Sequence, residues 1–189
     1  IGERGGFDGF VGNPPFMSAQ RITSTYGSVY RDFLVEYIAK GKRGTSDLCA
    51  YFFLRSIDQL NRNGYMGLIA TNTISEGNTR EVGLSQIVGG GCQIYRAVSS
   101  RKWPGDASLS VAEVWIAKGG WKGKSILDGS SINKTSAFLR PVSAVRGKPY
   151  RLAANEGKAF QGSIPLGRGF ILEPDEALGL IEKNPRNRD

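Results

Sequence analysis

The segment FDGFVGNPPF, residues 7–16, joins a short apolar run to a turn with two consecutive prolines. The apolar run is bounded by turn residues, which predicts a buried strand. The turn at 13–16 is stiff, because each proline ring fixes its own φ. The Asn13 side-chain oxygen and the Pro14 carbonyl are both hydrogen-bond acceptors, so together they predict a pocket for a planar amino group. Phe16 adds a ring face for base stacking, which is worth roughly 1–3 kcal/mol per base.

The composition is that of a globular protein with a basic surface. The 189 residues fit one large or two small domains, and 40% of them are hydrophobic. No apolar run approaches about 18 residues, so we expect no transmembrane helix and no membrane partner. Residues 1–6 are polar and glycine-rich and include no Met, which predicts a segment of a longer polypeptide without a signal peptide. The net charge of +8 fits either an ordinary basic surface or a polyanion partner.

Cysteine and histidine usage narrows the chemistry. Cys49 and Cys92 lie in apolar surroundings, which predicts reduced core residues of a cytoplasmic protein. The chain contains no histidine. This excludes Ser-His-Asp and Cys-His catalysis within the chain, together with histidine metal ligands, and we expect no metal site.

Hydrophobic spacing after the proline turn predicts an α/β fold. A helix is expected from Asp47 to about Asn61, with Thr45 or Ser46 as its N-cap, and Asn63-Gly64 as its end. Further helical segments are expected over 32–39 and within 73–86, and strands over 65–71, 93–97 and 108–117. A helix followed by a strand is the repeating unit of an α/β sheet. The last two strands are joined by a loop, which predicts an antiparallel hairpin at the sheet edge.

The character of the sequence changes near residue 120. Gly, Ser, Pro and basic residues become frequent, and helical periodicity returns only over 174–181. We therefore predict one domain over 1–120 and a second, mixed and mostly β, segment over 121–189.

Several stretches resemble motifs of DNA amino-methyltransferases. The turn 13–16 resembles motif IV of the enzymes that methylate adenine N6. The later motifs V, VI, VII and VIII resemble, in order, residues 47–53, 64–72, 73–80 and 103–111. Residues 77–83, 94–97 and 103–105 narrow the resemblance to the gamma-class enzymes, and within them to single-chain restriction-modification and phage-defence proteins of the MmeI type.

This resemblance implies a fold and a reaction. Residues 1–120 would form the C-terminal half of a class I (Rossmann-like) methyltransferase sheet, and 121–189 a linker with the beginning of a target recognition domain. The complete protein would transfer a methyl group from S-adenosylmethionine to adenine N6 in duplex DNA. Asn13 and Pro14 would orient the amino group and Pro15 would hold the turn. A base inside a duplex is out of reach, so it would be flipped out and stacked between Phe16 and Trp103.

Basic residues have two interpretations. Arg80, Arg101 and Lys102 would contact phosphates beside the flipped nucleotide, or would simply lie on a solvated surface. Arg168 lies in a glycine-rich stretch, 160–170, that fits either two short strands with tight turns or a loop approaching DNA. Trp103 has an alternative too, as a core or hinge residue.

The sequence departs from the family pattern in the loop that would bind the cofactor. The acidic, glycine-rich S-adenosylmethionine loop should precede motif IV, yet no such element stands before Phe7. Only Asn13 would belong to the cofactor pocket, so this chain alone is expected not to methylate DNA and to bind S-adenosylmethionine poorly. It should also expose a sheet edge, through which it could form homo-oligomers. Two alternatives stay open: a protein glutamine N5-methyltransferase, which needs the same acceptor pair, and a non-catalytic DNA-binding fragment.

Overall fold

The computed structural model describes residues 5–104, 109–143, 158 and 172–188. Its two compact units, Ile1–Ala144 and Val145–Asp189, are considered separately. The first contains the strands β1 (Phe7–Gly12), β2 (Leu60–Thr71), β3 (Gln93–Lys102), β4 (Ser110–Ala117), β5 (Ser125–Leu127) and β6 (Ser130–Ile132). Its helices are α1 (Ala19–Phe33), the π-helical η1 (Leu34–Ile38), α2 (Leu48–Gln59), the 3-10 turn η2 (Asn72–Ser75), α3 (Gly77–Val82) and α4 (Leu84–Gly89). The second contains α5 (Pro174–Lys183) and the 3-10 turn η5 (Pro185–Arg188).

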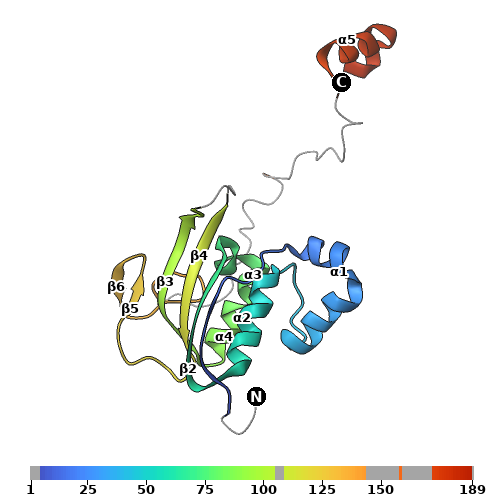
Figure 1. The fold of residues 1–189 in the computed structure, drawn as a ribbon. Helices are drawn as coiled ribbons and strands as arrows, with labels where there is room; N and C mark the ends of the chain where they lie inside the picture. Colours follow the sequence, from blue (N-terminus) through green and yellow to red (C-terminus); the bar gives the residue numbers. More distant parts are fainter. Residues whose placement is uncertain (1–4, 105–108, 144–157, 159–171, 189) are drawn as a thin grey trace. The chain divides into compact units, whose positions relative to one another are not determined.

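The strands form one mixed sheet in the order β1-β2-β4-β3-β5-β6 (Figure 1). β1 pairs in parallel with β2, and β4 runs antiparallel to both β2 and β3. The predicted α/β class and the predicted β3–β4 hairpin are therefore confirmed. The prediction that this hairpin lies at the sheet edge is wrong, because β5 pairs in parallel with β3 beyond it. Ser125 fixes that addition, since its hydroxyl donates to the Ile94 carbonyl at 3.1 Å.

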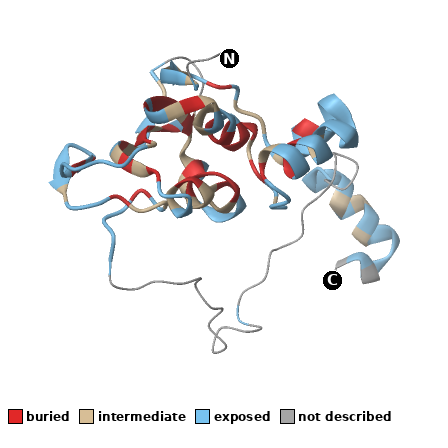
Figure 2. Cartoon of the chain, turned by 90° about the horizontal axis from the view of Figure 1, so that it is seen from below, coloured by how far each residue is buried: buried red, intermediate tan, exposed pale blue. Residues whose placement is uncertain are grey.

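Helices α2, α3 and α4 lie on one face of the sheet (Figure 1). Their apolar sides and the inward residues of the strands form one buried cluster, which the red segments of Figure 2 mark. Phe53, Ile94 and Ile116 are completely buried within it. Cys49 and Cys92 are both free and buried, as predicted.

The opposite face of the sheet carries aromatic side chains. Gly67 on β2 pairs with Trp115 on β4, and Arg96 on β3 places its guanidinium 5.0 Å from the centre of the Trp115 ring. A separate stack joins Tyr95 to Trp121 with ring centres 4.7 Å apart. This face is only partly buried.

Strand β1 forms as predicted but is not buried. It has a single neighbour in the sheet, β2, and its side chains Phe7 and Val11 are 48% and 94% exposed. The sequence predicts a buried strand here because apolar residues are usually buried, but no described residue covers the outer edge of β1. An exposed edge of this kind is what the sequence predicted for a sheet that lacks part of its strands.

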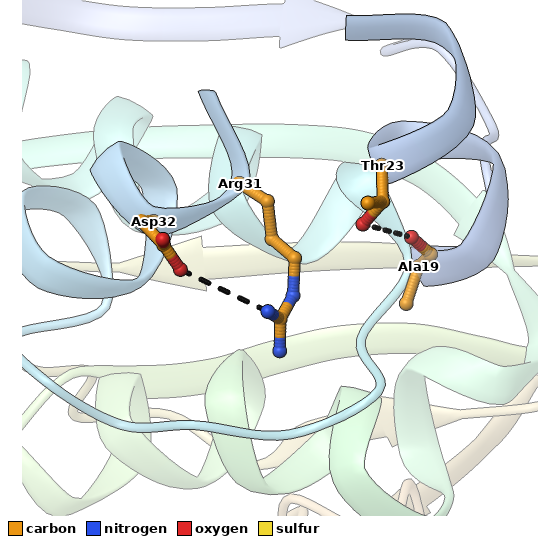
Figure 3. Close-up of polar contacts among 4 residues, drawn as sticks. All are labelled: Ala19, Thr23, Arg31 and Asp32. Atoms are coloured by element: carbon orange, nitrogen blue, oxygen red, sulfur yellow. Dashed lines mark hydrogen bonds and ion pairs between the residues drawn. The ribbon is translucent and has the colours of Figure 1, made fainter. Parts of the chain in front are cut away.

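Helix α1 begins at Ala19, thirteen residues before the predicted start at 32, and continues into η1. The periodicity was hidden because Gly27, with φ of 84°, interrupts the helix. Two local polar contacts support it (Figure 3). The Thr23 hydroxyl donates to the Ala19 carbonyl at 3.4 Å, and Arg31 lies 3.8 Å from the Asp32 carboxylate. Figure 2 shows α1 as largely exposed, so such contacts stabilise it little.

Helix α2 forms as predicted, with two corrections at its ends. Its N-cap is Asp47 rather than Thr45 or Ser46, because the Asp47 carboxylate accepts from Cys49 N at 3.0 Å. Its last residue is Gln59, and β2 begins at once with Leu60. Lys118 fixes this early end, since its Nζ donates to the carbonyls of Ile57 and Leu60 at 2.6 and 2.7 Å.

The second unit confirms the helix predicted over 174–181, as α5. Arg168 and the stretch 160–170 lie outside the described residues. The first unit continues past residue 120, since β5 and β6 belong to its sheet. The division into 1–120 and 121–189 stays a prediction. None of the described helices is long and apolar enough to cross a membrane.

Candidate functional site

The carboxyl ends of the parallel strands bring the proline turn and Trp103 to one edge of the sheet. β1 and β2 are parallel, and β3 runs the same way because both β2 and β3 are antiparallel to β4. The proline turn after β1, the segment after Thr71 and the loop after Lys102 therefore leave the sheet at the same edge. In open α/β sheets this is the edge where ligands bind.

The proline turn follows the last residue of β1, Gly12, at this edge. Asn13 and Pro15 are exposed, Pro14 is buried, and Phe16 is half-buried against the core cluster. Within the described part of the chain, no side chain or backbone N–H donates to the Asn13 side chain or the Pro14 carbonyl. Neither acceptor is therefore engaged by a donor among the described residues.

The end of the turn is held by the N-terminus of α2. Met17 N donates to the Asp47 carboxylate at 3.3 Å, and Leu48 N donates to the Met17 carbonyl at 2.8 Å. Asp47 N in turn donates to the buried Thr79 hydroxyl at 3.2 Å. Asp47 is not among the site residues that the sequence predicts. An aspartate directly before an amphipathic helix is a strong N-cap signal that could have identified it.

A pocket of about 500 Å³ lies beside this junction. Hydroxyl groups dominate its lining, and one carboxylate, that of Asp47, reaches it. The lining residues are Ser18, Ala19, Gln20, Thr45, Asp47, Thr71, Asn72, Thr73, Thr79, Leu109 and Ser110. They come from the segments after β1 and β2 and from the start of β4, so the pocket lies at the carboxyl edge.

Cys49 lies next to the pocket but is not equipped to act as a nucleophile. Its Sγ is 3.9 Å from the Thr71 hydroxyl, which forms a 2.8 Å hydrogen bond with Thr73. Burial, and after it the neighbouring Asp47 carboxylate, raises the pKa of the Cys49 thiol far above its ordinary value. The thiol therefore stays protonated at neutral pH.

Trp103 follows β3 and is half-buried. Its backbone N–H donates to the Leu109 carbonyl at 2.9 Å, which closes the base of the β3–β4 connection. Residues 105–108 between them are outside the described ranges. Trp103 thus lies at the carboxyl edge, and its role in base stacking stays a prediction.

The basic side chains differ in how far they are engaged within the chain. The Arg80 guanidinium is 3.8 Å from the centre of the Phe138 ring and 3.5 Å from the Glu81 carboxylate. Arg101 pairs with Glu113 at 2.5 Å but remains 52% exposed. Lys102 is exposed, and its side chain has no hydrogen-bond or ion-pair partner among the described residues.

The described residues fit only one end of a methyl-donor site. Asn13 is exposed at the end of β1, and no described residue covers the outer edge of this strand. The described residues therefore provide Asn13 at one end of such a site and no cradle for the rest of S-adenosylmethionine.

The model of the Eco57I restriction-modification methylase family matches residues 1–87. Among solved structures, the type IIL restriction-modification enzyme MmeI in complex with DNA matches with a TM-score of 0.70 at 16% identity, over 94% of this chain and 26% of that one. The predicted resemblance to MmeI-like restriction-modification methyltransferases is confirmed. The chain spans about a quarter of the length of MmeI.

Two other solved structures are similar to smaller parts of this chain. The DrdV–DNA complex matches at 14% identity and a TM-score of 0.42, over 62% of this chain and 14% of that one. The type I restriction-modification methyltransferase subunit from Streptococcus thermophilus matches at 16% identity and a TM-score of 0.42, over 73% and 31% of the two chains. No curated protein matches the sequence.

Proposed function

We propose that this chain is the C-terminal half of the catalytic domain of a DNA methyltransferase, followed from about residue 121 by the beginning of a target recognition domain. In the complete protein it would act on adenine N6 in duplex DNA, in the bacterial or archaeal cytoplasm. One observation carries the proposal. The proline turn holds two unused acceptors, on Asn13 and Pro14, at the carboxyl edge and beside a hydroxyl-lined pocket. The family match over residues 1–87 includes this turn.

The two acceptors suit an amino nucleophile. An exocyclic NH₂ group has two N–H donors, and each can donate to one of the two oxygens. Holding both hydrogens in this way fixes the direction of the nitrogen lone pair, which is how positioning lowers the barrier to attack. No histidine base is needed, because the proton can leave after the methyl group has been transferred.

Phe16 and Trp103 are proposed to stack the flipped base. Phe16 is anchored against the core but half-exposed, and Trp103 stands at the same edge of the sheet. A base removed from the duplex loses its stacking partners, and aromatic faces replace them. Pro15 keeps the turn in place through its fixed φ.

S-adenosylmethionine, the donor that the resemblance implies, supplies an electrophilic methyl group. Within this chain only Asn13 would adjoin it, and the rest of the cofactor site is proposed to come from the remainder of the complete protein. The outer edge of β1, with Val11 94% exposed, is the surface to which that remainder would add.

Methylation by the complete protein tests the proposal. Duplex DNA would be incubated with the protein and isotopically labelled S-adenosylmethionine, then digested and analysed by nucleoside mass spectrometry. We expect labelled N6-methyladenine, and a loss of at least about 100-fold for Asn13→Ala, since misplacing a reacting group costs on that order. Label on cytosine N4 would correct the target base. Label on glutamine of added protein and none on DNA would favour the glutamine methyltransferase. DNA binding without any transfer would favour a non-catalytic module.

A further inference from the structure

We infer that Asp47 is a positioning residue for the methylation reaction, acting through the backbone of the proline turn; this inference rests on the proposed function. The carboxylate does two things at once. It caps α2 by accepting from Cys49 N at 3.0 Å, and it holds the turn by accepting from Met17 N at 3.3 Å.

The contacts around Asp47 form a closed clasp between the turn and the helix. Met17 donates its N–H to Asp47 and accepts from Leu48 N at 2.8 Å. The two backbones are thus tied in both directions, one residue after Phe16. Upstream, the turn is fixed by the pairing of Gly12 with Leu68 in the sheet. Asp47 therefore supplies the downstream anchor of the proline turn, as the pairing of Gly12 supplies the upstream one.

Asp47 is itself held from the other side. Its backbone N–H donates to the Thr79 hydroxyl at 3.2 Å, and Thr79 is only 7% exposed. The backbone of Asp47, at the N-terminus of α2, is thus tied to Thr79 on α3. A group held in this way can transmit the position of the helix to the turn, which a mobile surface carboxylate cannot do.

Three variants of the complete protein separate the two roles. Asp47→Asn keeps an acceptor oxygen in the same place and caps helices as well as aspartate does. Asp47→Ser also caps the helix, but its oxygen is one bond shorter and does not reach Met17 N. Lys118→Met is the matched control, because Lys118 caps the other end of the same helix, far along the chain from the turn.

Loss of the Asp47 contact to Met17 is expected to affect kcat and not KM. For Asp47→Ser, kcat should fall by about 10- to 100-fold, with KM for DNA within about twofold, since a displacement of the order of 1 Å near reacting groups costs about 100-fold. Asp47→Asn should stay within about threefold of the unaltered protein. Lys118→Met should lower the melting temperature but leave kcat unchanged when assayed well below melting.

Hydrogen exchange of the Met17 amide gives a readout without catalysis. In this 189-residue chain, Asp47→Ser should speed exchange at Met17 by at least about 10-fold, while Lys118→Met should not. If Asp47→Ser leaves both kcat and Met17 exchange unchanged, the inference is wrong. If Asp47→Asn and Asp47→Ser lose activity equally, the charge rather than the clasp matters, and the inference is also wrong. If the unaltered complete protein does not methylate DNA, the proposed function fails, whereas the exchange result still decides whether the clasp exists.

Discussion

Replacing Gly67 with alanine should destabilise the sheet, because the Trp115 ring occupies the space beside it. A Cβ atom at residue 67 would lie 2.7 Å from both Cδ1 and Nε1 of Trp115. Carbon atoms in contact are normally about 3.5–4.0 Å apart, so the ring must retreat by roughly 1 Å. This displacement would disturb the contact of the ring with the Arg96 guanidinium, which now lies 5.0 Å from the ring centre.

The size of the effect follows from three contributions. Overpacking costs about 1–3 kcal/mol, and weakening a partly exposed cation–π contact costs about 0.5–1 kcal/mol. Alanine is favoured over glycine within a strand by about 0.5–1 kcal/mol, which offsets part of this cost. The expected net loss in the free energy of unfolding is therefore about 0.5–3.5 kcal/mol.

Urea unfolding of the 189-residue chain, followed by circular dichroism, measures this loss. Gly9→Ala is the matched control in β1, because a Cβ there would meet only the Tyr65 carbonyl at an ordinary 3.5 Å. It should be neutral or stabilising. In a Trp115→Ala background, Gly67→Ala should cost nothing, since the double-mutant cycle removes the clash. An equal cost of Gly67→Ala with and without Trp115 would refute the reasoning.

Three further predictions concern the site and its surroundings. Trp103→Ala in the complete protein should raise the KM for DNA by about 5- to 150-fold, which corresponds to losing roughly 1–3 kcal/mol of base stacking. An unchanged KM would indicate that Trp103 has only a structural role. Lys102→Ala in the complete protein should reduce the slope of log Kd for DNA against log salt concentration by about 1. Arg80→Ala should leave this slope unchanged, because the Arg80 guanidinium lies on the Phe138 ring; equal slopes for the two variants would contradict a phosphate contact by Lys102 alone. Burial raises the pKa of the Cys49 thiol in the folded chain, whereas in the unfolded chain this pKa is about 8.5. Above that pH only the unfolded chain releases the proton, so the free energy of unfolding falls by about 1.4 kcal/mol per pH unit. Below it, the contribution of the thiol to stability is complete. Between pH 7 and 10, the free energy of unfolding should therefore decrease less steeply with pH for Cys49→Ala than for the unaltered chain. Equal slopes would show that this thiol does not cause the decrease.

The parts of the fold that could be predicted are those with strong local signals. The spacing of α2 and the apolar runs of β2 and β4 reflect a helix and strands that bury one side against a single core. The double proline turn after β1 was equally visible, because proline acts on its own backbone. For these elements, local preference and tertiary packing agree.

The remaining features depend on contacts between distant residues. Lys118 ends α2 at Gln59, although it lies almost sixty residues further along the chain. β5 joins the sheet through three residues and the Ser125 hydroxyl, which is too short a segment to show a period. The exposure of β1 depends on what covers its outer edge, and its apolar sequence cannot show that. At the site, the clasp between Met17 and Asp47 joins residues thirty positions apart.

A calorimetric titration of S-adenosylmethionine tests the central claim most directly, namely that this chain holds the acceptor end of a methyltransferase site whose cofactor end lies elsewhere in a complete protein. The titration would be run on the 189-residue chain and on the complete protein, with Asn13→Ala of each beside it. We predict binding by the complete protein, weakened by Asn13→Ala, and no measurable binding by the chain alone. Tight binding by the chain alone would contradict the account, because the cofactor site would then lie within residues 1–189.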